Sequence, residues 1–207
     1  MNKQKLLILA GDSTDNRGDR AILLGNIILL KNTFQNCEIK ALSNNPERDS
    51  KWYGIEFFNR KGFFEKLKAY SWPDLIFWGG GELIQDDTSR IKIIYWFINI
   101  MLITVILRKK VIAFGQGLGP VNFRLTKILT KIMCNQLVAF FSRDNYSEKK
   151  LRSYGVKIPI ISAFDPAILI SEGVKRDKTA LKKYLANKKV KLSILLFYLH
   201  TKSSLLP

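Results

Sequence analysis

Residues able to do chemistry gather at five points of the chain, and each point directly follows an apolar run. These points, rich in Gly, Asp, Asn, Gln or Arg, are residues 11–19, 79–86, 115–120, 142–144 and 165–167. Glycine lets a backbone approach an anionic ligand closely, and a following helix offers free N–H groups and its positive dipole end. Taken singly, each glycine is explained as well by ordinary turn chemistry. Taken together, the points indicate a ligand-binding cleft.

The stronger glycine signal is "WGGGELIQDD", where triple glycine is followed by the polar anchors Glu82, Gln85 and Asp86. "GQGLG" is a weak signal alone. The loop after the first apolar run is neither a dinucleotide-binding GxGxxG nor a Walker P-loop, because no Lys follows its glycines. The candidate substrate-binding residues are Gly11, Asn16, Gly18, Gly79, Gly80, Gly81, Gln85, Asp86, Gly115, Gln116, Gly117, Asp144 and Asp165.

Arg143 and Asp144 come directly after "LVAFFS", at the expected tip of a strand. Two interpretations stay open. The pair could be a structural ion pair or a helix cap, or Arg143 could be aimed at a carboxylate or phosphate, which its planar fork suits. Asp165, before Pro166, could likewise serve only to cap a turn.

Neither a disulfide framework nor a metal site is expected. Cys37 and Cys134 lie far apart without metal-ligand spacing, which fits a reducing cytoplasm. No cluster of His, Cys and carboxylate residues has recognisable ligand spacing. The acidic "QDD" at 85–87 could hold a cation, although such carboxylates more often cap the following helix.

The formal net charge of +17 favours anionic partners, such as nucleic acid, an acidic membrane surface or phosphorylated substrates. Nucleic acid is not expected, because no zinc-finger spacing, recognition helix or ribonucleoprotein motif is present. The apolar segment 93–107 is 15 residues long, below the ~20 residues of a spanning helix, and predicts a helix buried against a sheet. Peripheral contact with an acidic membrane at its inner face, helped by Arg108, Lys109 and Lys110, stays open.

Strand-like apolar runs alternate with helical stretches. We expect strands at 5–11, 37–43, 73–81, 109–120, 136–144 and 158–167, with helices between them and a polar loop at 44–50. Apolar strands without polar alternation are buried on both faces, and alternation with helices implies right-handed crossovers. This predicts an α/β fold with a doubly wound, mostly parallel Rossmann-like sheet, whose ligands bind at the carboxyl ends of the strands.

The character of the sequence changes after Ala167. We expect a Rossmann-like domain over 1–170, then a charged linker helix and the first strand of a second domain, missing or truncated, over 171–207.

The ordered motifs "NRGDRAI", "FWGGGELIQD", "GQGLGPV", "SRDNYS" and "DPA" resemble the N-terminal half of the polysaccharide pyruvyl transferase family. The resemblance covers about residues 5–170, and ordered agreement of several motifs is more specific than any one of them. It implies the first half of a GT-B-like fold, with the active site between two Rossmann-like domains.

The implied reaction is transfer of a pyruvyl group from phosphoenolpyruvate, a co-substrate and not a cofactor, to a sugar of an exopolysaccharide or cell-wall polymer. The acceptor is a sugar or a lipid-linked saccharide. Such ketal formation needs an acid for the enol carbon, cations for the donor's anionic groups and a polar group for the sugar hydroxyl. Arg143 matches a motif position suited to the donor, and Asp19, or Asp15, could engage the acceptor hydroxyl.

Two alternatives remain at this stage. One is a sugar-nucleotide-dependent glycosyltransferase of the same fold. The other is a non-catalytic remnant that binds an anionic sugar ligand or a partner. The family's second domain supplies further basic residues and a histidine, and His200 is the only histidine here.

Overall fold

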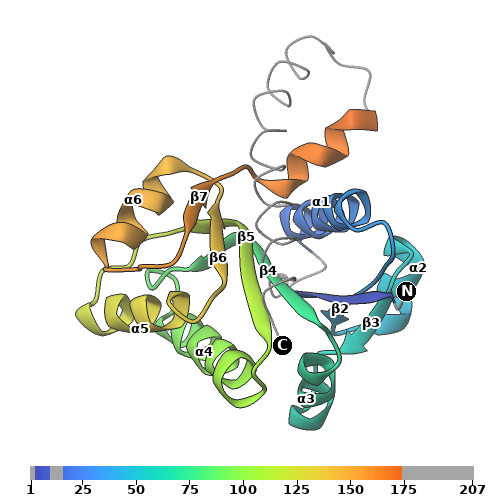
Figure 1. Cartoon of the computed structure of the whole chain (residues 1–207), viewed down its shortest axis with the longest axis horizontal. Coiled ribbons are helices and arrows are strands. Elements are labelled where there is room, and N and C mark those ends of the chain that lie inside the picture. The colour runs from blue at the N-terminus through green and yellow to red at the C-terminus, as the bar shows by residue number, and fades with distance from the viewer. Residues whose placement is uncertain (1–2, 10–15, 174–207) are drawn as a thin grey trace. The chain divides into compact units, whose positions relative to one another are not determined.

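The computed structural model describes residues 3–9 and 16–173, which form an α/β fold around one parallel sheet (Figure 1). The sheet has seven strands in the order β3-β2-β1-β4-β5-β6-β7, and every neighbouring pair is parallel. The strands are β1 (Gln4–Leu9), β2 (Cys37–Ser43), β3 (Glu56–Asn59), β4 (Leu75–Ile84), β5 (Lys110–Leu118), β6 (Ala139–Ser142) and β7 (Ile160–Ser162). The predicted doubly wound Rossmann-like fold is therefore confirmed.

Helices cover both faces of this sheet. They are α1 (Arg17–Thr33), α2 (Pro46–Tyr53), α3 (Phe63–Ser71), α4 (Arg90–Met101), α5 (Arg124–Cys134) and α6 (Asn145–Ser153). Helices α3, α4, α5 and α6 each contribute side chains to one buried cluster with the strands. These side chains include Tyr70, Trp96, Met133 and Leu151, one from each helix. Figure 1 shows α1 across the sheet from α4 and α5. Because both faces are covered, the central strands are apolar without alternation.

The segment predicted as a polar loop at 44–50 is instead the start of a helix, α2. Asn45 caps this helix by accepting from the Arg48 N–H at 3.2 Å, and Pro46 occupies the first turn, where its missing N–H costs nothing. Gly54 ends the helix with a φ of 64°, and the unpredicted edge strand β3 follows. The loop prediction was wrong because it was based on the polar composition of this segment and not on its helix-capping residues.

The long apolar helix is α4, extended by a π-helical segment at Leu102–Ile106. Its buried side chains include Ile93, Trp96 and Ile100, which contact the sheet cluster as predicted. Within the described residues, no helix combines the length and apolar character that a bilayer crossing requires.

A 3-10 helix at Pro166–Gly173 follows β7. The chain divides into compact units at 1–169 and 170–207. The linker helix and strand predicted for the end of the chain, beyond residue 173, lie outside the described residues.

Candidate functional site

The glycine motifs lie on an extension of two neighbouring strands beyond the rest of the sheet. Pairing between β1 and β4 ends at Leu9 and Trp78, whereas β4 and β5 stay paired until Ile84 and Leu118. The sheet's topology reverses between β1 and β4, since the chain builds β2 and β3 on one side of β1 and β4 to β7 on the other. Ligands of open α/β sheets bind at this switch point, outside the carboxyl ends of the strands. The motifs therefore occupy the expected edge.

Each glycine of "GQGLG" makes room for a residue of another motif. A Cβ at Gly115 would lie 2.3 Å from the Pro166 ring, and Gly115 also has a φ of 64°. A Cβ at Gly117 would lie 2.7 Å from Nε of Arg143, and one at Gly119 would lie 2.6 Å from Oε1 of Gln85. Motifs far apart in the sequence thus interlock at β5.

In the triple glycine of β4, Gly79 makes room for the β5 backbone and Gly80 makes room for α1. A Cβ at Gly79 would lie 2.2 Å from the Phe114 carbonyl oxygen, and one at Gly80 would lie 1.8 Å from Cγ2 of Ile22. A Cβ at Gly81 would make only an ordinary van der Waals contact, with Cδ1 of Ile22 at 3.9 Å. Among Gly79, Gly80, Gly81, Gly115 and Gly117, only Gly81 leaves its Cβ position unfilled by protein atoms. Close packing of protein on protein explains the other four.

Arg143 stands at the tip of β6 with carboxylates on three sides. Its Nη2 pairs with Oε1 of Glu82 from β4, its Nε lies 3.5 Å from Oδ2 of Asp144, and its Nη1 lies 3.9 Å from Oδ2 of Asp165. The guanidinium lies against Gly117, and 27% of the side chain is exposed. We call Glu82, Arg143, Asp144 and Asp165 the strand-tip cluster.

Two members of this cluster also cap helices, as the alternative interpretation expected. Asp144 accepts from the Ser147 N–H at 2.7 Å and begins α6. Asp165 accepts from the Ala167 N–H at 3.0 Å. Each carboxylate has a second oxygen to offer, so capping is compatible with a contact to Arg143.

Gln116 is buried in β5, and neither its amide oxygen nor its amide nitrogen has a hydrogen-bond partner. Buried polar groups are nearly always paired, so an unpaired one calls for a ligand, a water molecule or another explanation. Gln116 lies between Gly115 and Gly117 in β5, and its backbone carbonyl accepts from the Arg143 N–H, just after the neighbouring strand β6, at 3.2 Å.

Asp86 is placed differently from the other candidates. Its carboxylate is 3% exposed and accepts from the N–H groups of Asn122 and Phe123 and from the Thr126 hydroxyl. These groups are the entry and first turn of α5, so Asp86 holds the start of this helix. Gln85 donates to Oγ1 of Thr88 at 3.2 Å.

The N-terminal motif begins α1. Asn16 is the N-cap and accepts from the Gly18 N–H at 2.8 Å, and Asp19 lies in the first turn. Arg20 stacks on Trp52 of α2 at 4.2 Å from the ring centre. Gly11, Asp15 and His200 lie outside the described residues.

Comparison with protein-family models gives a match to polysaccharide pyruvyl transferase over residues 16–203. The chain belongs to the polysaccharide pyruvyl transferase family. No curated protein matches it significantly.

Two solved structures share the fold of this pyruvyl transferase family member. A protein assigned as a UDP-N-acetylglucosamine 2-epimerase from Listeria monocytogenes has a TM-score of 0.52 at 17% identity, covering 84% of this chain and 48% of its own. The UDP-GlcNAc 2-epimerase from Methanocaldococcus jannaschii has a TM-score of 0.52 at 14% identity, with 82% and 50% covered. The chain thus spans about half the length of these GT-B-like structures. At such identities the likeness concerns the fold alone.

The structure adds residues to the site that the sequence did not single out. Ile22 and Pro166 fill the space left by Gly80, Gly25 and Gly115. Ser147 accepts from the Leu118 N–H at 2.8 Å and so ties the end of β5 to α6. Ile22 stands inside "NRGDRAI" and Pro166 inside "DPA", so motif membership was the only signal that could have found them.

The two thiols are poor nucleophiles. Burial raises the pKa of Cys37 and, more strongly, that of the fully buried Cys134. A raised pKa keeps each thiol protonated at neutral pH, whereas the thiolate is the reactive form. Within 3–9 and 16–173, no three His, Cys, Asp or Glu residues are grouped as metal ligands.

Proposed function

We propose that this chain takes part in transfer of a pyruvyl group from phosphoenolpyruvate to a sugar hydroxyl of an exopolysaccharide or cell-wall polymer. Family membership over residues 16–203 is the observation that carries the proposal. The interlocking of the motifs at one sheet edge supports it, because that edge is where such folds bind ligands.

Arg143 is the proposed donor-binding residue. Its fork can pair with a carboxylate or phosphate in two parallel hydrogen bonds, as phosphoenolpyruvate would require. In the strand-tip cluster, Glu82 already pairs with Nη2 of Arg143. Three carboxylates around one guanidinium disfavour a further anion, so donor binding requires one carboxylate to leave. Glu82 has the most exposed side chain of the three, at 44%, and is the one that we expect to give way.

The acceptor sugar is proposed to lie beside this donor site. Asp19 in the first turn of α1 is the candidate for engaging the hydroxyl that attacks. The unpaired amide of Gln116 can donate to or accept from a sugar hydroxyl or a donor oxygen. Of the remaining candidates, Gly81 lies in the extension of β4, and Asn16 is the N-cap of α1, the helix that follows β1.

One assay tests the proposal. The protein is incubated with phosphoenolpyruvate and candidate lipid-linked or free saccharides, and phosphate release and ketal formation are measured. Formation of both products together is the expected result. Release of a nucleoside diphosphate from a sugar nucleotide without phosphoenolpyruvate would establish the glycosyltransferase alternative, and binding without turnover would establish the non-catalytic one.

Arg143→Lys is expected to raise the KM for phosphoenolpyruvate about tenfold or more, because the ammonium cannot reproduce the fork. Folding should be unaffected, since partly exposed ion pairs contribute at most ~1 kcal/mol. The measurements are donor-dependent initial rates and thermal unfolding. Arg152→Lys is the matched control, because Arg152 also pairs with a carboxylate, that of Glu148 at 3.1 Å, and both residues lie on α6. Wild-type donor kinetics in Arg143→Lys would remove Arg143 from the site.

The reaction is expected to need no metal ion, because the donor's charge is met by guanidinium and backbone groups. Activity should survive treatment with a chelator. Loss of activity that one divalent ion restores would contradict this expectation.

A further inference from the structure

Helices α4 and α5 expose several large apolar side chains. The side chains of Ile91 and Ile98 on α4 are 74% and 58% exposed, and that of Leu125 on α5 is 62% exposed. We define the α4–α5 surface by Ile91, Ile94, Ile98, Leu125, Ile128 and Ile132, all of them exposed. On each helix these residues follow a spacing of three and then four, so they form a stripe along one side.

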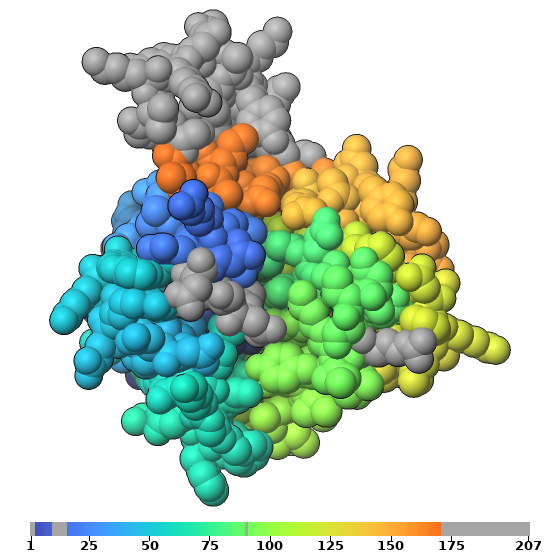
Figure 2. Space-filling view, turned by 180° about the vertical axis from the view of Figure 1, so that it is seen from behind, coloured from blue at the N-terminus to red at the C-terminus, as the bar shows by residue number. Residues whose placement is uncertain are grey.

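The two stripes lie on neighbouring helices. α4 packs directly against α5, and Figure 1 shows the two side by side on one face of the sheet. Both helices reach the face seen in Figure 2, α4 in light green and α5 in yellow. Contiguous apolar patches rimmed by polar residues mark interaction sites for proteins or membranes.

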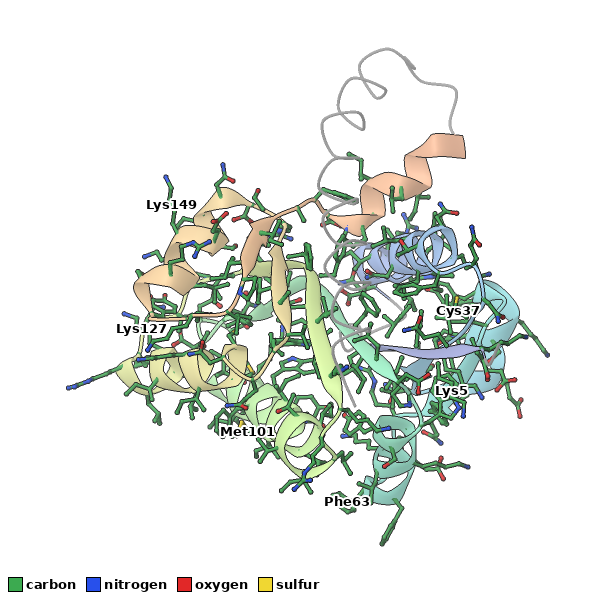
Figure 3. The ribbon with its side chains drawn as sticks, viewed as in Figure 1. Lys5, Cys37, Phe63, Met101, Lys127 and Lys149 are labelled. Carbon is green, nitrogen blue, oxygen red and sulfur yellow. The ribbon has the colours of Figure 1, made fainter. Side chains whose placement is uncertain are left out.

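The charge around this surface has a single sign. Between Asp87 and Asp144 the chain carries nine Lys or Arg residues and no Asp or Glu. Arg108, Lys110, Arg124 and Lys131 are exposed among them. Figure 3 labels Met101 at the end of α4 and Lys127 on α5, the helices that carry the apolar stripes. The nearest acidic residues along the chain, Asp87 and Asp144, stand outside the two helices.

We propose that the α4–α5 surface docks on an anionic lipid bilayer. Apolar side chains between basic ones are the pattern by which helices lie in a membrane interface, the apolar part entering the acyl boundary and the cations meeting lipid headgroups. A second copy of the chain fits less well. A two-fold contact through this surface would bring two cationic faces together without a single carboxylate from either helix pair.

Docking through α4 and α5 leaves the strand-tip cluster free, because Glu82, Arg143 and Asp165 belong to strand ends and not to these helices. The proposal does not depend on pyruvyl transfer, and its test uses no substrate.

The experiment is co-sedimentation of the 207-residue chain with vesicles of phosphatidylcholine alone or mixed with phosphatidylglycerol. Binding to the mixed vesicles, weakened by salt, is expected. Lys127→Glu/Lys131→Glu should lower the partition coefficient at least about tenfold, since each cation near an anionic surface strengthens binding about fivefold. Ile98→Ser/Leu125→Ser should also weaken binding, by about tenfold, through loss of apolar burial.

Lys31→Glu/Lys51→Glu is the matched control. Lys31 and Lys51 are exposed in the last turns of α1 and α2, and their exchange lowers the net charge by the same amount. Partitioning of this control should stay within about twofold of wild type, as expected for charges distant from the contact. Circular dichroism confirms that each variant is folded.

Three outcomes would overturn the proposal. The first is no binding of the wild type to phosphatidylglycerol vesicles. The second is an equal loss in the control, which would show attraction by net charge alone. The third is a dimer in analytical ultracentrifugation that Ile98→Ser/Leu125→Ser converts to monomer, which would make the surface a contact between copies.

Discussion

Gly80→Ala is expected to lower the free energy of unfolding by about 4 kcal/mol, from a steric and a backbone contribution. The added Cβ would lie 1.8 Å from Cγ2 of Ile22, which no rotamer adjustment of alanine can relieve. The φ of 99° at Gly80 is also unfavourable for any residue with a side chain. Since Ile22 holds α1 against β4, the substitution should push the helix from the sheet. Urea unfolding followed by circular dichroism measures the loss.

Gly81→Ala separates the two contributions. Gly81 has a φ of 80° but no atom within 3.4 Å of its Cβ position, so only the backbone cost, about 1–2 kcal/mol, should appear. Ile22→Ala should partly rescue Gly80→Ala, giving a coupling energy above ~1 kcal/mol in a double-mutant cycle. Equal losses in Gly80→Ala and Gly81→Ala would show that Ile22 adjusts freely and that the close approach is unimportant.

Asp86→Ala is expected to cost about 3 kcal/mol of stability, because it leaves buried donors at the start of α5 without an acceptor. The carboxylate accepts from Asn122, Phe123 and Thr126, and Asp86 is almost fully buried. Asp86→Asn keeps one acceptor oxygen and should cost about half as much. Thermal and urea unfolding measure both variants.

The neighbouring Asp87→Ala is the control for Asp86. Asp87 is exposed, and its carboxylate accepts from the Thr88 N–H at 2.8 Å. We expect a change within about 0.5 kcal/mol, as for most surface substitutions. If Asp86→Asn left stability unchanged but abolished donor use, Asp86 would act in the reaction and would not serve mainly to hold the start of α5.

Local residue pattern determined most of the architecture. The unbroken apolar runs of β1, β4, β5 and β6 predicted a parallel sheet, because only strands covered on both faces lack polar alternation. The carboxyl-end position of the motifs followed from that topology. Even α2, which was predicted as a loop, is encoded locally by Asn45, Pro46 and Gly54. The loop prediction failed because it relied on polar composition and did not consider these helix-capping residues.

Only the tertiary structure shows why glycine is needed at these motif positions. The sequence predicted that they let a ligand approach, and the structure shows that Ile22, Pro166 and Arg143 occupy the Cβ positions of Gly80, Gly115 and Gly117. These partners lie 26 to 58 residues away along the chain, so no local pattern could name them. The same holds for Arg143: the sequence offered Asp144 as its partner, whereas Glu82 from β4 makes the closest contact. Pairing across strands depends on register and on the crossover of the chain, which exist only once the sheet has formed.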